Sequence, residues 1–127
     1  MNKKTGFLLL ALVTLSMGCA QYKMEIQEVV LPEPELYNLV LEKAAANEWD
    51  NVIATIDRYE RLYVNGPNIQ ELRLKRADAH FNNSSRKSLI LAKGEYQNFL
   101  ALYPRYDKED YIWLQIAKCS VKQMLPA

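Results

Sequence analysis

Few side chains in this chain of 127 residues are of the types that carry out chemistry, and their spacing does not bring them together. His80 is the only histidine, and no cysteine or pair of carboxylates stands beside it to complete a metal site. Ser84, Ser85 and Ser88 follow no nucleophile-elbow or triad pattern, and no Gly-rich phosphate-binding loop is present. We therefore expect His80 in the core or at its edge and the serines in a loop. The chain is expected not to be an enzyme and to need no metal or other cofactor.

The N-terminus is the exception, because it places a thiol directly after a segment typical of an export signal. Lys3 and Lys4 precede the apolar stretch 7–15, which is too short to span a bilayer. The small residue Gly18 then precedes Cys19. This order predicts a signal peptide at residues 1–18. An ordinary secretory peptide with an incidental cysteine is the alternative.

The segment Leu15-Ser16-Met17-Gly18-Cys19 resembles the lipobox of bacterial lipoproteins, although that family prefers Leu where Ser16 stands. The resemblance implies that the thiol of Cys19 takes a diacylglyceryl group, so that lipid anchors the chain to a membrane. Ala20, rather than Asp, after the cysteine implies delivery to the outer membrane. Cys119 then has no cysteine to pair with, and we expect it to be a small buried apolar residue.

Composition and proline spacing set the remaining domain plan. Lys and Arg number 16 against 15 Asp and Glu, so the near-neutral chain gives no sign of a nucleic-acid partner. Residues 19–33 are expected to form a lipidated tether, because Pro32 and Pro34 block a continuous helix. Residues 34–127 are expected to form one helical domain.

The stretch from Trp49 to Pro67 organises that domain. Its apolar residues recur at steps of three and four, the spacing of one helix face, and Asn65-Gly66-Pro67 stops it. Apolar spacing and turn residues along the rest of the domain predict five helices in all, at about residues 34–46, from 49 to the stop at 65–67, 68–81, from 89 to 102, and from Asp107 to about 124.

Several local expectations accompany these helices. Gly66 tolerates a positive φ, which suits the stop at 65–67. Asn68 and Asp107 are expected to cap helices, and residues 82–88 are expected to form a loop. Arg73 and Arg76 interrupt an apolar stripe. Either their guanidinium groups extend into the solvent, or the assignment of residues to the two faces of this helix is shifted by one position. Gly94 lies inside a helix, where only close packing would explain it.

The apolar stripe returns 40 residues later. At this offset Ile56 corresponds to Tyr96, Tyr59 corresponds to Phe99, and Leu62-Tyr63 corresponds to Leu102-Tyr103. Two such hairpins and a fifth helix predict an all-α, tetratricopeptide-like fold of about two and a half repeats. The fifth helix would then expose Ile112, Ile116 and Cys119 for a partner to cover.

These motifs resemble the repeats of the BamD (YfiO) lipoproteins, which assemble outer-membrane proteins. The matching segments are 47–53, 62–67, 77–81, 99–104 and 110–117. The resemblance implies a scaffold on the periplasmic face of the outer membrane. Its partners would be the barrel-assembly subunit, other assembly lipoproteins and unfolded outer-membrane proteins. The family has about five repeats, so the resemblance also implies a chain truncated at its C-terminus.

Tyr37, Leu74, Asp78 and Trp113 are the candidate residues for a partner or substrate surface, because they fall at positions that such repeats use for ligands. Two alternatives remain open at this point. One is a periplasmic repeat lipoprotein that serves as an adaptor for cell-wall or pilus machinery, and the other is a vestigial fragment.

Overall fold

The structure is a computed structural model, and it describes residues 29–125. A compact helical unit begins at Leu31. The expected signal peptide and Cys19 lie outside the described residues, as does most of the expected tether, and so they stay predictions.

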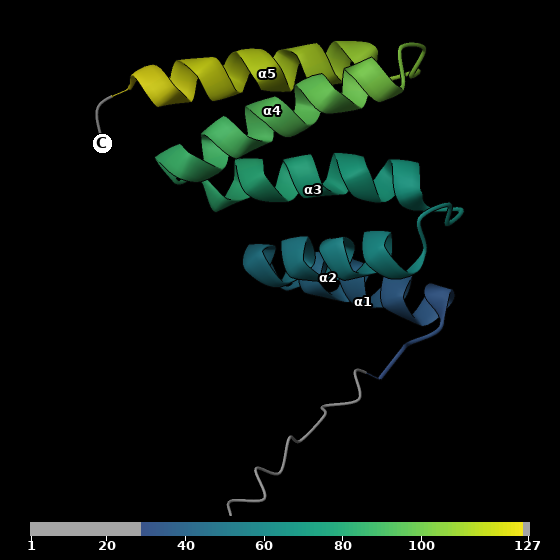
Figure 1. Cartoon of the computed structure of the whole chain (residues 1–127). Helices are drawn as coiled ribbons and strands as arrows, with labels where there is room; N and C mark the ends of the chain where they lie inside the picture. Colours follow the sequence, from purple (N-terminus) through teal and green to yellow (C-terminus); the bar gives the residue numbers. More distant parts are fainter. Residues whose placement is uncertain (1–28, 126–127) are drawn as a thin grey trace, which may run out of the picture. The chain divides into compact units, whose positions relative to one another are not determined.

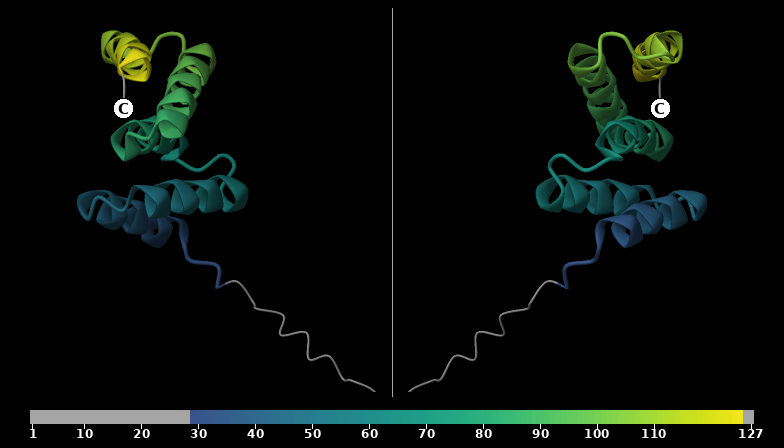
Figure 2. Two further views of the ribbon diagram at one scale, coloured as in Figure 1. Left: turned by 90° about the vertical axis from the view of Figure 1, so that its left-hand side faces the viewer. Right: turned by 90° about the vertical axis from the view of Figure 1, so that its right-hand side faces the viewer.

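The described chain is all-helical and contains no strand. Its helices are α1 (Glu33–Ala45), α2 (Trp49–Leu62), α3 (Ile69–Asn83), α4 (Arg86–Leu102) and α5 (Glu109–Met124). Each helix packs mainly on the helix before it and the helix after it. Figure 1 shows the helices following one another in chain order, and Figure 2 shows α3 and α5 on one side of α4. The predicted all-α, tetratricopeptide-like arrangement of helix hairpins is confirmed.

The 40-residue period holds in the backbone as well as in the side chains. Tyr63 and Tyr103 follow the last residues of α2 and α4, and their N–H groups donate to Tyr59 and Phe99 at 2.8 and 2.9 Å. The turns that follow also repeat, because Gly66 N–H donates to Tyr63 and Tyr106 N–H donates to Tyr103. The hairpins are therefore two copies of one unit.

The core consists of two clusters with α3 between them. One face of α3 presents Leu72 and Ala79 to the cluster built on α1 and α2. The other face presents Leu74 and Ala77 to the cluster that holds Ala92, Tyr96 and Phe99 of α4. A helix with apolar residues on two faces needs a neighbour on both, which explains its broad stripe.

The expected loop at residues 82–88 is wrong, because α3 continues to Asn83 and α4 begins at Arg86. Only two residues make the turn. Ser84 adopts the left-handed conformation with φ 61°, and the Ser85 hydroxyl accepts the N–H of Ser88 at 3.1 Å as an N-cap. α4 has 17 residues, whereas α2, its counterpart in the first hairpin, has 14.

Neither of the two residues that the sequence suggested as helix caps makes a side-chain cap. Asn68 occupies the N-cap position of α3, as expected, but its side chain makes no capping bond and its amide donates instead to Glu33 at 2.9 Å. Lys108, not Asp107, precedes α5, and no side chain caps that helix. α1 instead ends in a Schellman motif: Asn47 has φ 58°, and the N–H of Glu48 donates to Lys43 at 3.0 Å.

Neither Gly66 nor Gly94 has the role that the sequence suggested for it. Gly66 does not have a positive φ; a side chain is excluded there by the ring of Tyr59. Gly94 is not closely packed, because a Cβ added there would meet nothing within 4 Å.

Candidate binding surface

An open groove of about 480 Å³ lies where α3 meets the two loops that flank it in the stack. α3 contributes residues one turn apart, which stand on one face of the helix. The loops before α3 and before α5 contribute the rest. Its lining residues are Pro67, Asn68, Gln70, Glu71, Leu74, Lys75, Asp78, Tyr106 and Lys108.

Two of the four candidate residues, Leu74 and Asp78, meet in this groove, and a third stands at its margin. Tyr37 of α1 donates its hydroxyl to both carboxylate oxygens of Glu71 at 3.0 Å. Burial and the neighbouring carboxylate raise the pKa of that phenol, so it stays a neutral donor. Leu74 is only 9% exposed and belongs to the core, so it supplies the groove with an apolar edge rather than a free side chain.

Asp78 is held by two tyrosines. Its Oδ1 accepts the hydroxyl of Tyr96 at 2.6 Å and that of Tyr111 at 2.8 Å. Gln115, one turn further along α5, donates to the Tyr111 oxygen at 2.8 Å and so extends the chain of bonds along that helix. Burial, with help from the Asp78 carboxylate, raises the pKa of Tyr96 and keeps it protonated. Asp78 therefore joins α3 to α4 and α5 in addition to bordering the groove.

Trp113 does not line the groove. It lies two positions from Tyr111 on α5, which places the two side chains on different faces of the helix. Its indole is 53% exposed and donates to Glu109 of the same helix at 3.0 Å. The structure thus separates Trp113 from the other three candidates.

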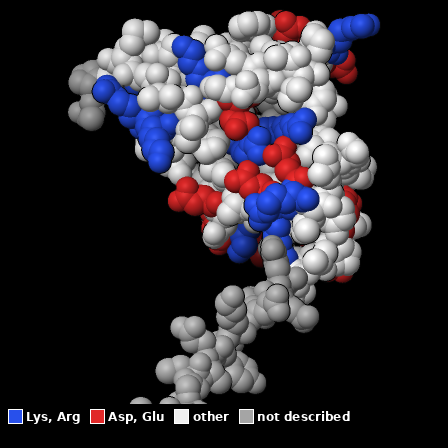
Figure 3. Space-filling view, in the orientation of Figure 1, with Lys and Arg blue, Asp and Glu red and all other residues white. Residues whose placement is uncertain are grey.

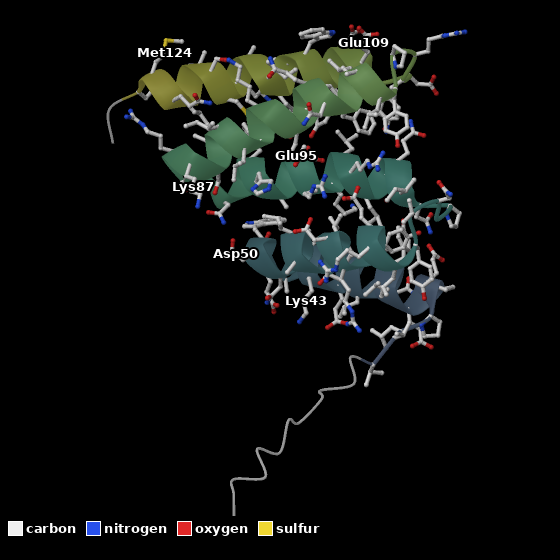
Figure 4. The ribbon with its side chains drawn as sticks, viewed as in Figure 1. Lys43, Asp50, Lys87, Glu95, Glu109 and Met124 are labelled. Atoms are coloured by element: carbon white, nitrogen blue, oxygen red, sulfur yellow. The ribbon has the colours of Figure 1, made fainter. Side chains whose placement is uncertain are left out.

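Arginine side chains build an ionic network that the sequence did not reveal. Arg76 binds Asp57, Glu60 and Glu95 at 3.1, 2.6 and 3.0 Å. Arg73 donates to Glu60 at 2.7 Å and to the Tyr103 hydroxyl at 3.0 Å. Figure 3 shows acidic and basic side chains interleaved across this face, and in Figure 4 Glu95 lies between α3 and α4. The arginines connect α2, α3 and α4. Their guanidinium groups therefore pair within the protein, and the assignment of residues to the faces of this helix is not shifted.

Within the network, the pKa shifts of Glu60, Arg73 and Arg76 all favour the charged forms. Burial alone would raise the pKa of Glu60, but hydrogen bonds from Arg73 and Arg76 outweigh it and lower that pKa. Because every carboxylate already meets an arginine, this network is a brace between helices and offers no poised acid or base.

The remaining candidates for chemistry have structural surroundings. Burial lowers the pKa of His80 and so favours the neutral imidazole. Cys119 is fully buried, as predicted, and burial raises the pKa of its thiol. Among residues 29–125 no three His, Cys, Asp or Glu side chains gather in a way that would hold a metal ion.

The sequence matches no protein-family model. No helix within the described range is long and apolar enough to cross a membrane.

Proposed function

We propose that this chain is a non-enzymatic scaffold lipoprotein of the outer-membrane β-barrel assembly machinery, as its resemblance to BamD implies. The observation that carries the proposal is the stack of tetratricopeptide-like hairpins with an open groove of mixed charge at one edge. Stacked helical repeats serve as extended binding surfaces for other macromolecules.

The lipobox adds the location. A diacylglyceryl group on Cys19 would hold the chain at the periplasmic face of the outer membrane, with the helical unit reaching the machinery through the tether 19–33. Its partners would be the barrel-assembly subunit, the other assembly lipoproteins and unfolded outer-membrane proteins.

The groove has the chemistry that an unfolded outer-membrane protein segment needs. Lys75 and Lys108 supply ammonium groups, Tyr106 and Pro67 supply apolar surface, and Gln70 supplies an amide. An extended peptide that alternates aromatic and acidic side chains would meet a partner for each. We therefore assign the groove to the unfolded client.

Within residues 29–125, several side chains of the types that enzymes use as catalysts have structural roles. The Ser85 and Ser88 hydroxyls bond to each other at 2.7 Å in the cap of α4. Cys119 lies in the core, and the charged network pairs its carboxylates with arginines. These assignments support a scaffold over an enzyme.

Crosslinked pull-down from native membranes tests the proposal. We expect the wild type to recover the barrel-assembly subunit and the Cys19→Ser variant to lose it, because that variant cannot take the lipid. The double variant Lys75→Glu, Lys108→Glu should keep the subunit but recover less unfolded client. Lys87→Glu is the matched control, since its side chain is exposed outside the groove.

Recovery of cell-wall or pilus proteins in place of the barrel-assembly subunit would overturn the proposal in favour of the adaptor alternative. Equal client recovery by the double variant and by Lys87→Glu would overturn the assignment of the groove.

A further inference from the structure

The outer face of α5 is an uncovered copy of a face that is buried elsewhere in the same chain. By the 40-residue period, Leu114, Ala117 and Val121 of α5 correspond to Leu74, Ala77 and Phe81 of α3. On α3 these positions pack into the cluster with α4. On α5 they are exposed, with Leu114 at 53% and Val121 at 55%.

The expectation that Ile112, Ile116 and Cys119 form the open face of α5 is wrong. These three side chains are buried against α4, just as Leu72 and Ala79 of α3 are buried against α2. The open face is the opposite one.

Exposed apolar side chains concentrate on this outer face. Large hydrophobic residues elsewhere in the described chain are exposed singly or in pairs, whereas the outer half of α5 presents a stripe that runs its length. Its members are Trp113, Leu114, Val121, Met124 and the following Leu125. In Figure 4 the labelled Glu109 and Met124 mark its two ends, and in Figure 1 no other helix lies beyond α5. A continuous apolar stripe of this kind marks a protein interface.

We infer that this face is covered by the same face of a second copy of this chain, with the two α5 helices antiparallel about a two-fold axis near Ala117. A two-fold interface needs a patch that is complementary to itself. The apolar stripe meets that condition, because it is the only exposed stripe of its length on the described helices and the small Ala117 at its middle lets two helices approach closely.

Charge gives the second argument for a copy of the chain as the occupant. The first turn of α5 is acidic, with Glu109 and Asp110, while its second half carries Lys118 and Lys122. Antiparallel pairing about Ala117 sets the acidic first turn of each copy beside the last turn of the other, which carries Lys122, and it also opposes the helix dipoles. A parallel pair would place like charges side by side.

The face is held in place before it meets a partner. Arg86 of α4 donates to the carbonyl of Gln123 at 3.1 Å, and the Gln123 amide donates to the carbonyl of Leu89 at 3.3 Å. These bonds fix the last turn of α5 to the start of α4. Little ordering of the helix is then required on association, which favours binding.

Cysteine crosslinking of the full chain in membranes tests the inference. Ala117→Cys places a thiol beside the proposed axis, so mild oxidation should give a disulfide-linked dimer. Ile90→Cys is the matched control, because Ile90 is an exposed apolar residue of α4, away from this face, and should give none. Failure of Ala117→Cys to exceed the control, or its crosslinking to a different protein, would overturn the inference.

Charge reversal in the Ala117→Cys background tests the antiparallel pairing. Asp110→Lys and Lys122→Glu should each lower the crosslinked fraction roughly tenfold when expressed alone, because each makes both contacts repulsive. When the two variants are expressed together, each contact again joins opposite charges, and a mixed dimer should form. Crosslinking that is unchanged by either variant, or not restored in the mixture, would overturn the pairing.

Discussion

The ring of Tyr59 lies so close to Gly66 that a Cβ on Gly66 would fall 2.9 Å from two of its carbons. Tyr59 is fully buried, and its hydroxyl donates to Glu33 and accepts the N–H of Asn68 at 3.4 Å. The ring therefore has little freedom to move away. In the second hairpin Phe99 replaces Tyr59, and Tyr106 stands at the place of Gly66 and packs edge-on against Phe99 with ring centroids 5.0 Å apart. The space beside the glycine position is therefore filled by the Tyr59 hydroxyl in the first hairpin and by the ring of Tyr106 in the second.

Alanine at the two glycines should move stability in opposite directions. Gly66→Ala should lower the free energy of unfolding by about 1–3 kcal/mol, because it overpacks the Tyr59 corner. Gly94→Ala should raise it by about 0.5–1 kcal/mol, since the methyl group meets open space and Ala favours the helix. Urea unfolding of both variants checks this, and each serves as the control for the other. A stabilised Gly66→Ala variant would show that the Tyr59 ring yields.

The two hydroxyls on Asp78 should differ in what they contribute. Tyr96→Phe should cost about 1–3 kcal/mol, because Tyr96 is fully buried and the change leaves a partly buried carboxylate one donor short. Tyr111→Phe should cost less, since Tyr111 is 38% exposed and water can replace its hydroxyl. Thermal or urea unfolding measures both. If Tyr111→Phe proves the costlier change, the bond from Asp78 to α5 would be the more important one.

The sequence alone was sufficient to predict the helices whose side chains form the core. Tyr59, Tyr96 and Phe99 are buried where the period of 3.6 and the repeat of 40 place them, because burial of an apolar stripe depends mainly on local spacing. Tyr63 and Tyr103 even share backbone angles, φ −129° and ψ 63° against φ −128° and ψ 67°.

Contacts between distant residues could not be predicted in this way. The Asn68 amide binds Glu33, 35 residues earlier, and so does not cap α3. Arg76 looks like an error in an apolar stripe until α2 and α4 bring carboxylates to it from both sides. Ser84 ends α3 in a left-handed conformation that is uncommon for serine, so a polar run of residues looked like a longer loop. The groove also needs the packed stack, because its lining comes from three separate segments.

Acid should weaken the fold through Glu60. The folded-state pKa of Glu60 lies below its usual value of 4.5, so its carboxylate stabilises the fold at pH values above 4.5. That contribution is lost as the pH falls through the lowered folded-state pKa. Glu60→Gln should therefore be destabilised relative to the wild type at pH 7, and the difference should shrink as the pH falls below 4.5. Unfolding curves at a series of pH values measure it.

Glu42→Gln is the control for Glu60→Gln, because Glu42 is exposed on α1. It removes the same charge without touching the network. A Glu60→Gln variant whose stability differs from the wild type by the same amount at every pH would contradict the assignment of this pH dependence to Glu60.

The thiol of Cys119 should be protected by the packing of α5 on α4. Cys119 is fully buried, and burial raises the pKa of its thiol, so little thiolate forms and reagents cannot reach it. At pH 8 we expect Cys119 to react with a thiol reagent at least about a hundredfold more slowly than an exposed cysteine, because reaction must wait for the helix to open. Ile90→Cys supplies that exposed cysteine on α4, away from the face that we assign to the dimer, and Cys19→Ser removes the other thiol from both proteins. The slow rate should rise to that of the exposed thiol in denaturing urea. Fast labelling of Cys119 in the native protein would mean that α5 leaves α4 readily, and the rigid outer face that we assign to α5 would then be wrong as well.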